Sequence, residues 1–371
     1  MQPPEVPQKL GRYQVLAKIG EGGMAAVYLG RRLGPAIAED DDEFVALKVI
    51  RDEYAGNADF VTMFLDEVKI VASLRHPSII RLLEFGQEGR RLYCALELVM
   101  GQSLWRVWDA CKMRRSRLRY DWLAYVGARI AEGLHHAHEL RDERGNQVGF
   151  VHRDVSPSNV LLSYDGRVKI IDFGLAKAQH RLSKTTAGVL KGKYAYMAPE
   201  QAQSSSIDRR ADLYALGVSL WELSCDRRLF KRKNDIDTLI AVGEANIPDP
   251  CTLIEGYPRP LWRVLRHAMR KEPQKRYANG LDMARDLDTY AKLEGRTLAQ
   301  SDIASIMHAL FAFEAEHDEA LLAGMSESFE NASSGDRPSF SQASSAPPIA
   351  PDEWKRTLPA GLLNERRPPP K

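Results

Sequence analysis

The 371-residue sequence has few cysteines, no long apolar run and no excess of charge of either sign. Its four cysteines include no C-x-x-C pair, which argues against a zinc site or a disulfide framework and fits reduced thiols in a cytosol. No apolar run approaches the ~20 residues that a membrane helix needs. The first residues also lack the basic patch and apolar stretch of a signal peptide. We therefore expect a cytoplasmic protein without a membrane span.

The charge balance argues against a strongly anionic main partner. With 52 basic and 50 acidic residues the net charge is +2, which gives no reason to expect nucleic acid or an anionic membrane as the main partner. The short basic clusters Arg114-Arg115 and 231–233 are interpreted as solvated faces. With 44% apolar residues, the chain can bury the core of one large or two modest domains.

Hydrophobic patterns divide the chain into a strand-rich part, residues 12–100, and a helical part that begins at Leu104. Runs rich in β-branched and aromatic residues predict strands at 13–19, 25–31, 44–50 and 92–100. Apolar spacings of three and four predict helices at 58–74, 122–140, 212–223, 260–269, 280–293 and 298–322. The acidic stretch at 38–43 should be a solvent loop.

The last part of the chain has a different composition. Residues 326–371 are rich in Ser and Pro and bury too little apolar surface to offset their ordering entropy, so we expect disorder there. Two apolar clusters, 354–358 and Leu362-Leu363, leave open docking onto the domain or onto a partner. The helix at 298–322 either extends the preceding domain or mediates self-association between chains, and we favour the first.

Two short motifs carry the chemistry. Residues 152–159 read His-Arg-Asp-Val-Ser-Pro-Ser-Asn, and Asp172-Phe173-Gly174 follows a strand-like stretch at 168–171. They offer one carboxylate to orient a hydroxyl, and an amide and a second carboxylate to hold metal ions. D-F-G alone is common by chance, but both motifs in this order and spacing resemble the catalytic and metal-binding motifs of protein kinases.

This resemblance covers about residues 11–290. It implies an α+β, two-lobed protein kinase fold with a small β-rich N-lobe and a larger helical C-lobe. The division that we expect is an N-terminal extension at 1–10, the N-lobe at 11–100, the C-lobe at 101–295, a helical extension at 296–325 and the tail at 326–371.

The stretch from Gly20 to Val27 resembles the family's phosphate loop, with Ala25 in place of the third glycine. Glycine suits phosphates because a missing Cβ lets backbone N–H groups come close. One added methyl should leave the loop able to cover the phosphates. The residues implied for the ATP site are Ile19, Gly20, Gly22, Gly23, Val27, Ala46, Lys48, Glu67, Leu96, Glu97, Val99 and Leu161.

The resemblance also implies a role for each part of that site. Lys48 would contact the α- and β-phosphates and pair with Glu67 on the helix at 58–74. Adenine would lie between Val27 and Ala46 on one side and Leu161 on the other, with its edge facing the backbone of residues 97–99. Asn159 and Asp172 would hold two Mg²⁺ ions, with Mn²⁺ as the alternative ion.

Asp154 is implied to accept the hydroxyl proton and to aim the nucleophile. Serine/threonine kinases usually place a Lys two residues after this Asp and a Thr in G-T-x-x-Y-x-A-P-E, but here those positions hold Ser156 and Lys193. We hypothesise a reciprocal swap, in which Lys193 supplies the cation near the γ-phosphate and Ser156 the hydroxyl that orients Asp154. The rival interpretation is drift in a weakened enzyme.

Regulatory and structural roles follow from the same resemblance. Ser183, Thr185 and Thr186 are candidate phosphorylation sites whose phosphate would pair with Arg153, and we favour the two threonines. Glu200 should pair with Arg276, and Asp212 should anchor the backbone of the catalytic loop. A stacked column that links the lobes should consist of Val71, Leu82, His152 and Phe173.

The sequence is thus identified as a bacterial-type, eukaryotic-like serine/threonine protein kinase, which implies transfer of the ATP γ-phosphoryl group to protein Ser or Thr hydroxyls, its own included, in bacterial signalling. Tyrosine specificity is disfavoured because the tyrosine branch usually carries Ala-Ala-Arg or Arg-Ala-Ala after H-R-D-L. Here Pro157 is typical of the serine/threonine branch. The alternative is a nucleotide-binding scaffold that acts through protein interactions, supported only by the altered residues Ser156 and Lys193.

Overall fold

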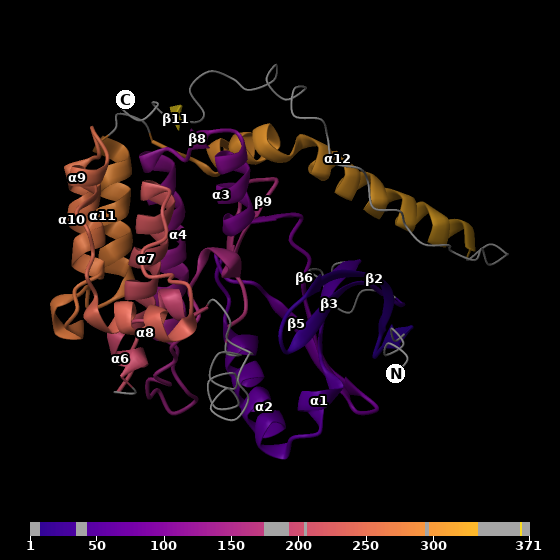
Figure 1. Ribbon diagram of the computed structural model, residues 1–371. Helices are drawn as coiled ribbons and strands as arrows, with labels where there is room; N and C mark the ends of the chain where they lie inside the picture. The colour runs from indigo at the N-terminus through magenta and orange to yellow at the C-terminus, as the bar shows by residue number, and fades with distance from the viewer. Residues whose placement is uncertain are drawn as a thin grey trace.

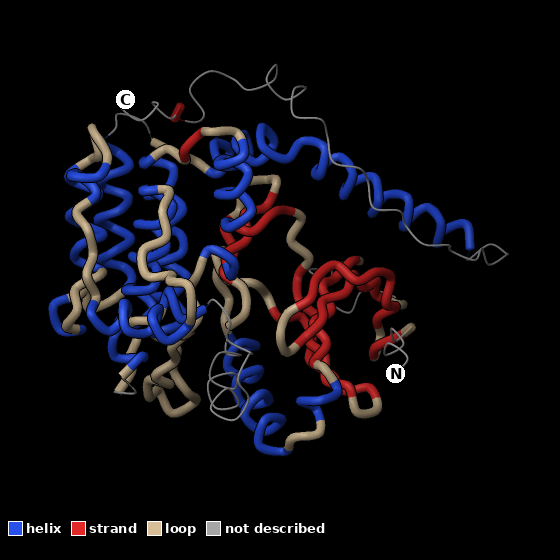
Figure 2. The backbone as a smooth tube through the Cα atoms, viewed as in Figure 1, coloured by secondary structure: helices blue, strands red, loops and turns tan. Residues whose placement is uncertain are grey.

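The computed structural model describes residues 8–34, 43–173, 193–203, 206–293, 297–332 and 364–365. Figure 1 shows a curled sheet built from the first part of the chain and a group of helices built from the rest. Figure 2 shows that most strands belong to the first of these two lobes and most helices to the second. No helix in the described ranges is both long and apolar enough to cross a membrane.

The N-lobe is built on six antiparallel strands in the order β1-β2-β3-β4-β6-β5. Their bounds are Lys9–Leu10, Tyr13–Glu21, Ala25–Arg32, Phe44–Ile50, Leu82–Glu88 (β5) and Arg91–Glu97 (β6). The four predicted strands are therefore present. Strand β5 was not predicted because Leu82, Leu83 and Phe85 do not alternate cleanly with polar residues. Most of the acidic stretch at 38–43 lies outside the described residues.

The described part of the N-lobe also contains the helices α1 (Asp52–Ala55) and α2 (Ala58–Ser73). Asn57 begins α2 because its side chain accepts a hydrogen bond from the backbone N–H of Phe60 at 3.0 Å. Phe60 stacks on Phe64, and Phe64 meets Phe85 of β5 with the ring centroids 5.9 Å apart. These aromatic contacts fix α2 beside the edge of the sheet.

The C-lobe is mostly helical. Its helices are α3 (Leu104–Met113), α4 (Tyr120–His138), α6 (Pro199–Ala202), α7 (Arg210–Cys225), α8 (Asp235–Glu244), α9 (Pro250–Leu253), α10 (Arg259–Ala268), α11 (Gly280–Leu293) and α12 (Gln300–Ala332). Helix α12 continues past the expected end at 322, so residues 326–332, which we assigned to the tail, are helical. The apolar cluster at 354–358 lies outside the described residues.

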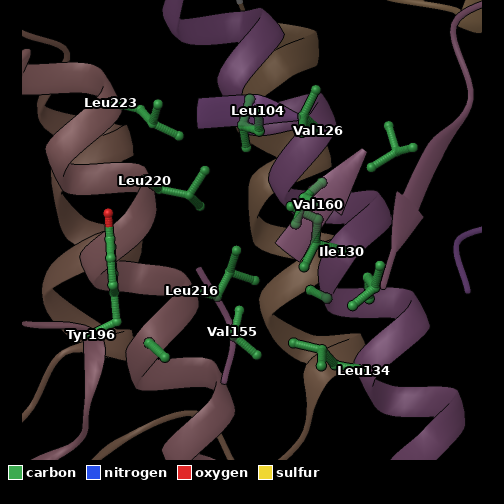
Figure 3. Close-up of a cluster of buried hydrophobic side chains, with 14 of the residues drawn as sticks. Leu104, Val126, Ile130, Leu134, Val155, Val160, Tyr196, Leu216, Leu220 and Leu223 are labelled. Carbon is green, nitrogen blue, oxygen red and sulfur yellow. The ribbon is translucent and has the colours of Figure 1, made fainter. Parts of the chain in front are cut away.

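Helix α7 is the centre of this lobe, since every residue from Ala211 to Cys225 is buried. A helix that is apolar on all sides must be enclosed by other elements. Figure 3 shows its leucines facing Val126 and Ile130 of α4. Gly127 permits this contact, because a Cβ there would lie 2.7 Å from Leu220 Cδ1. The rigid α4–α7 pair carries the loop described next.

Short strands and turns complete the described structure. A three-stranded sheet has the order β10-β9-β7, with bounds Val168–Ile170, Val160–Ser163 and Gly101–Ser103. The 3-10 turns are η1 (Pro157–Asn159), η2 (Lys193–Tyr196) and η3 (Pro273–Lys275). A two-residue pairing joins β8 (Ser116–Arg117) to β11 (Asn364–Glu365). The motif at 152–159 therefore lies between helix α4 and strand β9.

Candidate active site

The loop that carries Asp154 is fixed by a buried carboxylate beneath it. Asp212 of α7 is 1% exposed and accepts hydrogen bonds from the backbone N–H groups of His152 and Arg153, both at 2.8 Å. His138 of α4 provides a third contact at 2.7 Å. Burial raises the pKa of Asp212, but these hydrogen bonds outweigh burial and hold its pKa below the ordinary value. The anchoring predicted for Asp212 is present in the structure.

Two residues of the motifs have left-handed backbone conformations. Arg153 has φ 68° and Asp172 has φ 65°, a region that non-glycine residues rarely adopt. Such conformations cost of order 1–3 kcal/mol each and persist only where the surroundings determine them. For Arg153, the determining contact is the bond from its N–H to Asp212. Among the described residues, Arg115, Asp226 and Ala245 share this conformation, so it marks the two motifs without being confined to them.

Asp154 and Asn159 are joined directly. The Asn159 side-chain amide donates to Asp154 Oδ2 at 2.8 Å and to the Asp154 backbone oxygen at 2.7 Å. The turn η1 brings the two together, because Pro157 starts it and the Asn159 N–H closes it on the Ser156 carbonyl at 2.9 Å. Asp154 as a whole residue is half-buried.

A second pair crosses between the lobes. Lys48 of β4 donates from Nζ to Asp172 Oδ1 at 2.5 Å, with the two side chains 12% and 34% exposed. Glu67, the partner that the resemblance implies for Lys48, is on α2, but its side chain lies outside the described atoms. Lys48 and Asp172 thus bring a cation and a carboxylate together in front of an apolar pocket.

That pocket is lined by residues from both lobes, among them Val71, Leu82, Cys94, Leu96 and Phe173. Phe173 also meets His152 edge to face, with the ring centroids 4.7 Å apart.

His152 Nδ1 accepts from the Asp154 N–H at 3.2 Å, so Nε2 carries the proton that it donates to the Ile171 carbonyl at 3.1 Å. His152 is fully buried by these contacts.

The glycine-rich stretch forms the hairpin between β2 and β3. Gly20 pairs with Val27 across the strands, and the N–H of Gly22 donates to the Ala25 carbonyl at 2.8 Å. Ile19, at the end of β2, is 50% exposed. Arg51, which sequence reasoning missed, holds the hairpin by donating to Glu21 and to the Gly22 carbonyl at 2.7 and 2.8 Å.

The segment that joins the lobes follows β6, and we call residues 97–103 the hinge. Ala46 of β4 pairs with Leu96 just before it, and Leu161 of β9 pairs with Ser103 at its end. Of the residues predicted for the ATP site, Ala46, Leu96 and Leu161 therefore lie next to the two ends of the hinge. Val99 lies within it and is half-buried.

Sequence reasoning missed a buried ion pair at the hinge. Lys169 of β10 binds Glu97 with Nζ and Oε1 2.6 Å apart, and the two side chains are 8% and 9% exposed. Glu97 Oε1 also accepts the backbone N–H of Arg81 at 2.8 Å. Because Lys169 is three residues before Asp172, the pair connects the hinge to the D-F-G motif. One lysine within the apolar stretch 168–171 was the available signal.

The structural pair predicted in the C-lobe is also present. Arg276 Nη1 and Nη2 donate to the two carboxylate oxygens of Glu200 at 2.6 and 2.7 Å. Both residues are buried, and Arg276 also binds backbone carbonyls of Arg270 and Lys271. The two-point geometry is the strong form of an Arg–carboxylate contact. It fixes α6 against the C-lobe helices.

Several predicted residues lie partly or wholly outside the described part. Ser183, Thr185, Thr186 and Gly174 do so entirely. Lys193 begins η2, but its side chain is not described, so the proposed proximity to Ser156 stays a prediction. Ser156 is buried next to Asp154.

Asn159 and Asp172 suit a hard cation. The Asn159 amide nitrogen is engaged by Asp154, which leaves its Oδ1 as an oxygen donor, and Asp172 adds carboxylate oxygens. Mg²⁺ prefers such oxygens and commonly completes its shell with water and substrate phosphates. The described residues contain no cluster of three or more His, Cys, Asp or Glu side chains able to hold a metal ion.

These parts of the site are connected to one another. Val27, at the end of the glycine hairpin, pairs with Lys48, and Lys48 binds Asp172. The N–H of Ile171, the neighbour of Asp172, donates to the Asn159 carbonyl at 2.9 Å. Comparison with known proteins is consistent with this geometry. The family model for the protein kinase domain matches residues 13–284. The chain belongs to the protein kinase domain family.

The structural comparison agrees. The solved kinase domain of PknI from Mycobacterium tuberculosis matches with a TM-score of 0.57 at 24% identity, over 76% of this chain and 97% of that chain. At this identity the likeness concerns the fold. The predicted two-lobed α+β kinase fold is confirmed.

Curated relatives are bacterial kinases of more than one named specificity. The tyrosine-protein kinase MasK of Myxococcus xanthus is 39% identical over 283 residues, covering 76% of this chain and 43% of MasK. The serine/threonine-protein kinase PknL of Mycobacterium tuberculosis is 33% identical over 281 residues, covering 76% and 66%. PrkC of Bacillus subtilis, also named a serine/threonine-protein kinase, is 32% identical, covering 75% and 40%. The matches thus span between two fifths and two thirds of these relatives' lengths.

Proposed function

We propose that this chain transfers the γ-phosphoryl group of ATP to Ser or Thr hydroxyls of proteins, itself among them, as a cytoplasmic component of bacterial signalling. The proposal rests on two pairs, Asp154–Asn159 on the anchored loop and Lys48–Asp172 between the lobes. They lie close together, because the N–H of Ile171, the neighbour of Asp172, donates to the Asn159 carbonyl at 2.9 Å. Phosphoryl transfer requires mainly positioning and charge neutralisation, and these pairs offer both.

Each residue has a task in this proposal. The hairpin at Gly20–Gly23 covers the phosphates with backbone N–H groups, and Lys48 neutralises charge on the α- and β-phosphates. Asp154 accepts the proton of the attacking hydroxyl and aims its oxygen at the γ-phosphorus. Asn159 and Asp172 hold Mg²⁺, or Mn²⁺ in its place, which supplies neutralisation of charge on the transferring group. The adenine packs between Val27 and Ala46 on one side and Leu161 on the other.

The test is transfer of radiolabel from [γ-³²P]ATP with Mg²⁺ or Mn²⁺ to the protein and to a generic acceptor, comparing the parent with Asp154→Asn. We expect labelled phosphoserine or phosphothreonine after acid hydrolysis, and a loss of about 100-fold or more in the variant. Equal labelling of parent and variant would rule out the role of Asp154.

The acceptor hydroxyl could instead belong to tyrosine, because the relative MasK is named a tyrosine-protein kinase. Phosphoamino-acid analysis separates the two outcomes. Phosphotyrosine as the main product would replace Ser/Thr specificity in the proposal. ATP binding without any transfer would favour the scaffold alternative.

For the altered pair we propose the reciprocal swap between Ser156 and Lys193. Loss of a preorganised cation near the γ-phosphate costs ~2–4 kcal/mol of transition-state stabilisation. Lys193→Ala should therefore lower turnover about 30- to 1000-fold, whereas Lys193→Arg should keep much of it. If both variants keep full turnover, the swap is wrong.

Phosphorylation of Thr185 or Thr186 and its pairing with Arg153 also stays a proposal. Mass spectrometry of the purified protein after incubation with ATP locates the modified residues. Modification at neither threonine, with full activity, would exclude this form of regulation.

A further inference from the structure

Helix α12 lies beyond residues 13–284, the part matched by the kinase family model, and yet it is firmly docked on the C-lobe. Its buried residues recur at helical spacing: Ile303, Ile306, Met307 and Leu310. In Figure 1, α12 passes over α3 and β9 and then continues past the N-lobe sheet. The first half of α12 therefore packs as an integral part of the domain. It lies next to β9, the strand that follows the active-site loop.

Polar contacts at several points fix the position of this helix. Gln300 Nε2 donates to the Asp165 carbonyl at 2.9 Å, where the adjacent Gly166 has φ +89°. A Cβ at Gly166 would lie 2.1 Å from the Gln300 carbonyl oxygen, so only glycine permits this approach. Further along, the helix kinks at Phe311, and Arg114, the residue that follows α3, donates to the Leu310 carbonyl at 2.8 Å.

The contact closest to the hinge passes through one phenol. Tyr164, which is 4% exposed, donates to Asp318 Oδ2 of α12 at 3.1 Å and accepts from Gln102 Nε2 at 2.9 Å. Its backbone N–H also donates to the Met100 carbonyl at 2.9 Å. Burial raises the pKa of Tyr164 to about 12, so the phenol keeps the proton that it donates at neutral pH. Two of its partners, Met100 and Gln102, belong to the hinge.

The hinge is thus held from two directions. On one side the buried Lys169–Glu97 pair ties its first residue to β10. On the other side Tyr164 ties its later residues to α12, next to the backbone pairing of Gln102 with Leu162 and of Ser103 with Leu161. A hinge that is already ordered loses less conformational entropy when a ligand binds against it.

We infer that Tyr164, held by Asp318 of α12, is a positioning residue that orders the hinge for nucleotide binding. The helix outside the matched domain is then part of the nucleotide site, acting through Tyr164 and Gln102 without touching the nucleotide. The inference rests on the proposed binding of ATP at the hinge, but it does not require phosphoryl transfer.

The experiment is titration of the full chain with a fluorescent ATP analogue and Mg²⁺, paired with KM and kcat for ATP. Tyr164→Phe removes only the hydroxyl, and Asp318→Ala removes its acceptor. Loss of one hydrogen bond that orders the hinge should raise the Kd, and KM with it, about three- to tenfold, while kcat changes less than about twofold. Asp318→Asn, which keeps an acceptor oxygen, should recover most of the affinity.

A matched control is available in the C-lobe. Tyr277 donates to Asp286 Oδ2 at 2.6 Å, the same kind of phenol–carboxylate contact at a place away from the hinge. Tyr277→Phe should leave the Kd unchanged even if it lowers the unfolding temperature. An increase in Kd equal to that of Tyr164→Phe would show that both variants act through general stability, and it would overturn the inference.

The remaining outcomes are decisive as well. A Kd within about twofold of the parent for both Tyr164→Phe and Asp318→Ala overturns the positioning role. If Tyr164→Phe does not fold, the half-buried Asp318 supplies the deciding variant. A parent that binds nucleotide without transferring phosphate refutes the proposed kinase activity alone, whereas a parent that binds no nucleotide refutes both.

Discussion

The loop that carries Asp154 and the hairpin that carries Gly22 serve the same proposed substrate but are held differently. The loop rests on Asp212, a buried carboxylate with two backbone amides and a histidine as donors. The hairpin is held by Arg51 and Glu21, whose side chains are 38% and 54% exposed. Buried hydrogen bonds cannot be exchanged for water, whereas exposed ones can. The C-lobe part of the site is therefore set by folding, and the N-lobe part is free to adapt to a ligand.

The ion pairs that support the site and the ion pair within it differ in burial. Glu200–Arg276 and Lys169–Glu97 are almost fully buried and belong to the C-lobe or its junction with the hinge. Lys48–Asp172 crosses the cleft with the carboxylate one third exposed. Breaking a buried pair leaves an uncompensated charge, whereas an exposed pair contributes little. Substitutions in the two regions should thus separate stability from activity.

The largest expected effect is at Asp212. Asp212→Ala leaves three buried donors without an acceptor, at about 1–3 kcal/mol each, so we expect a loss of about 4 kcal/mol or more in the free energy of unfolding. Denaturant unfolding measures it. Asp208→Ala, an exposed acid at the start of α7, should cost only about 1 kcal/mol. Similar losses in both variants would contradict the anchoring role.

The pH dependence of the same variant gives an independent check. The pKa of Asp212 in the folded state lies below its unfolded value near 3.8. Its stabilisation is therefore complete above that unfolded value and is lost as the pH falls through the folded value. The difference in unfolding free energy between the parent and Asp212→Ala should be constant from about pH 8 to pH 5. It should become smaller in stronger acid.

The next effect is at the hinge. Lys169→Met leaves Glu97 charged and buried, which should cost about 3 kcal/mol of unfolding free energy. The double variant Glu97→Leu/Lys169→Met removes both charges and should recover most of that loss. Lys18→Met, which breaks an exposed pair with Glu21, should change stability by less than about 0.5 kcal/mol. A double variant as unstable as the single one would show that packing is the dominant contribution.

Lys48→Met should affect activity more than stability, the opposite of the substitutions above. We expect less than about 1 kcal/mol of lost stability, because Asp172 keeps access to water, but a drop of about 100-fold or more in phosphate transfer. Thermal unfolding and the radiolabel assay on the same preparation test this. A stability loss comparable to that of Asp212→Ala would remove the distinction between the lobes.

The smallest effect is at Arg51. Arg51→Ala should change the free energy of unfolding by no more than about 0.5 kcal/mol, since both partners are well exposed. The Kd for the ATP analogue should rise only about twofold, because the hairpin can order around the phosphates without this support. A tenfold rise would show that Arg51 preorganises the hairpin as firmly as Asp212 holds the catalytic loop.

Local patterns in the sequence predicted the helices and strands well where periodicity was strong. The strand at 44–50 and the helix at 280–293 have the predicted bounds. Strand β5 and the last turns of α12 were missed, because neither shows a clean period. The motif residues Asp154, Asn159 and Asp172 could be singled out because their residue types at that spacing resemble a known family.

The supporting residues could not be predicted in the same way. His138 completes the shell of Asp212, Lys169 holds Glu97, and Tyr164 connects the hinge to α12, yet none belongs to a motif that the sequence analysis used. Each acts through a partner between 72 and 154 positions away in the chain. Such contacts depend on which surfaces the folded lobes bring together.

The sequence by itself determined the element types and the polar groups of the site, because helical and strand periods and short motifs are local properties of the chain. Only the tertiary structure decided how the site is held: which carboxylates are buried, which cations satisfy them, and that Tyr164 links a helix beyond the family domain to the hinge. The physical reason is that burial and hydrogen-bond satisfaction are properties of surfaces in contact, and the chain order does not encode them locally.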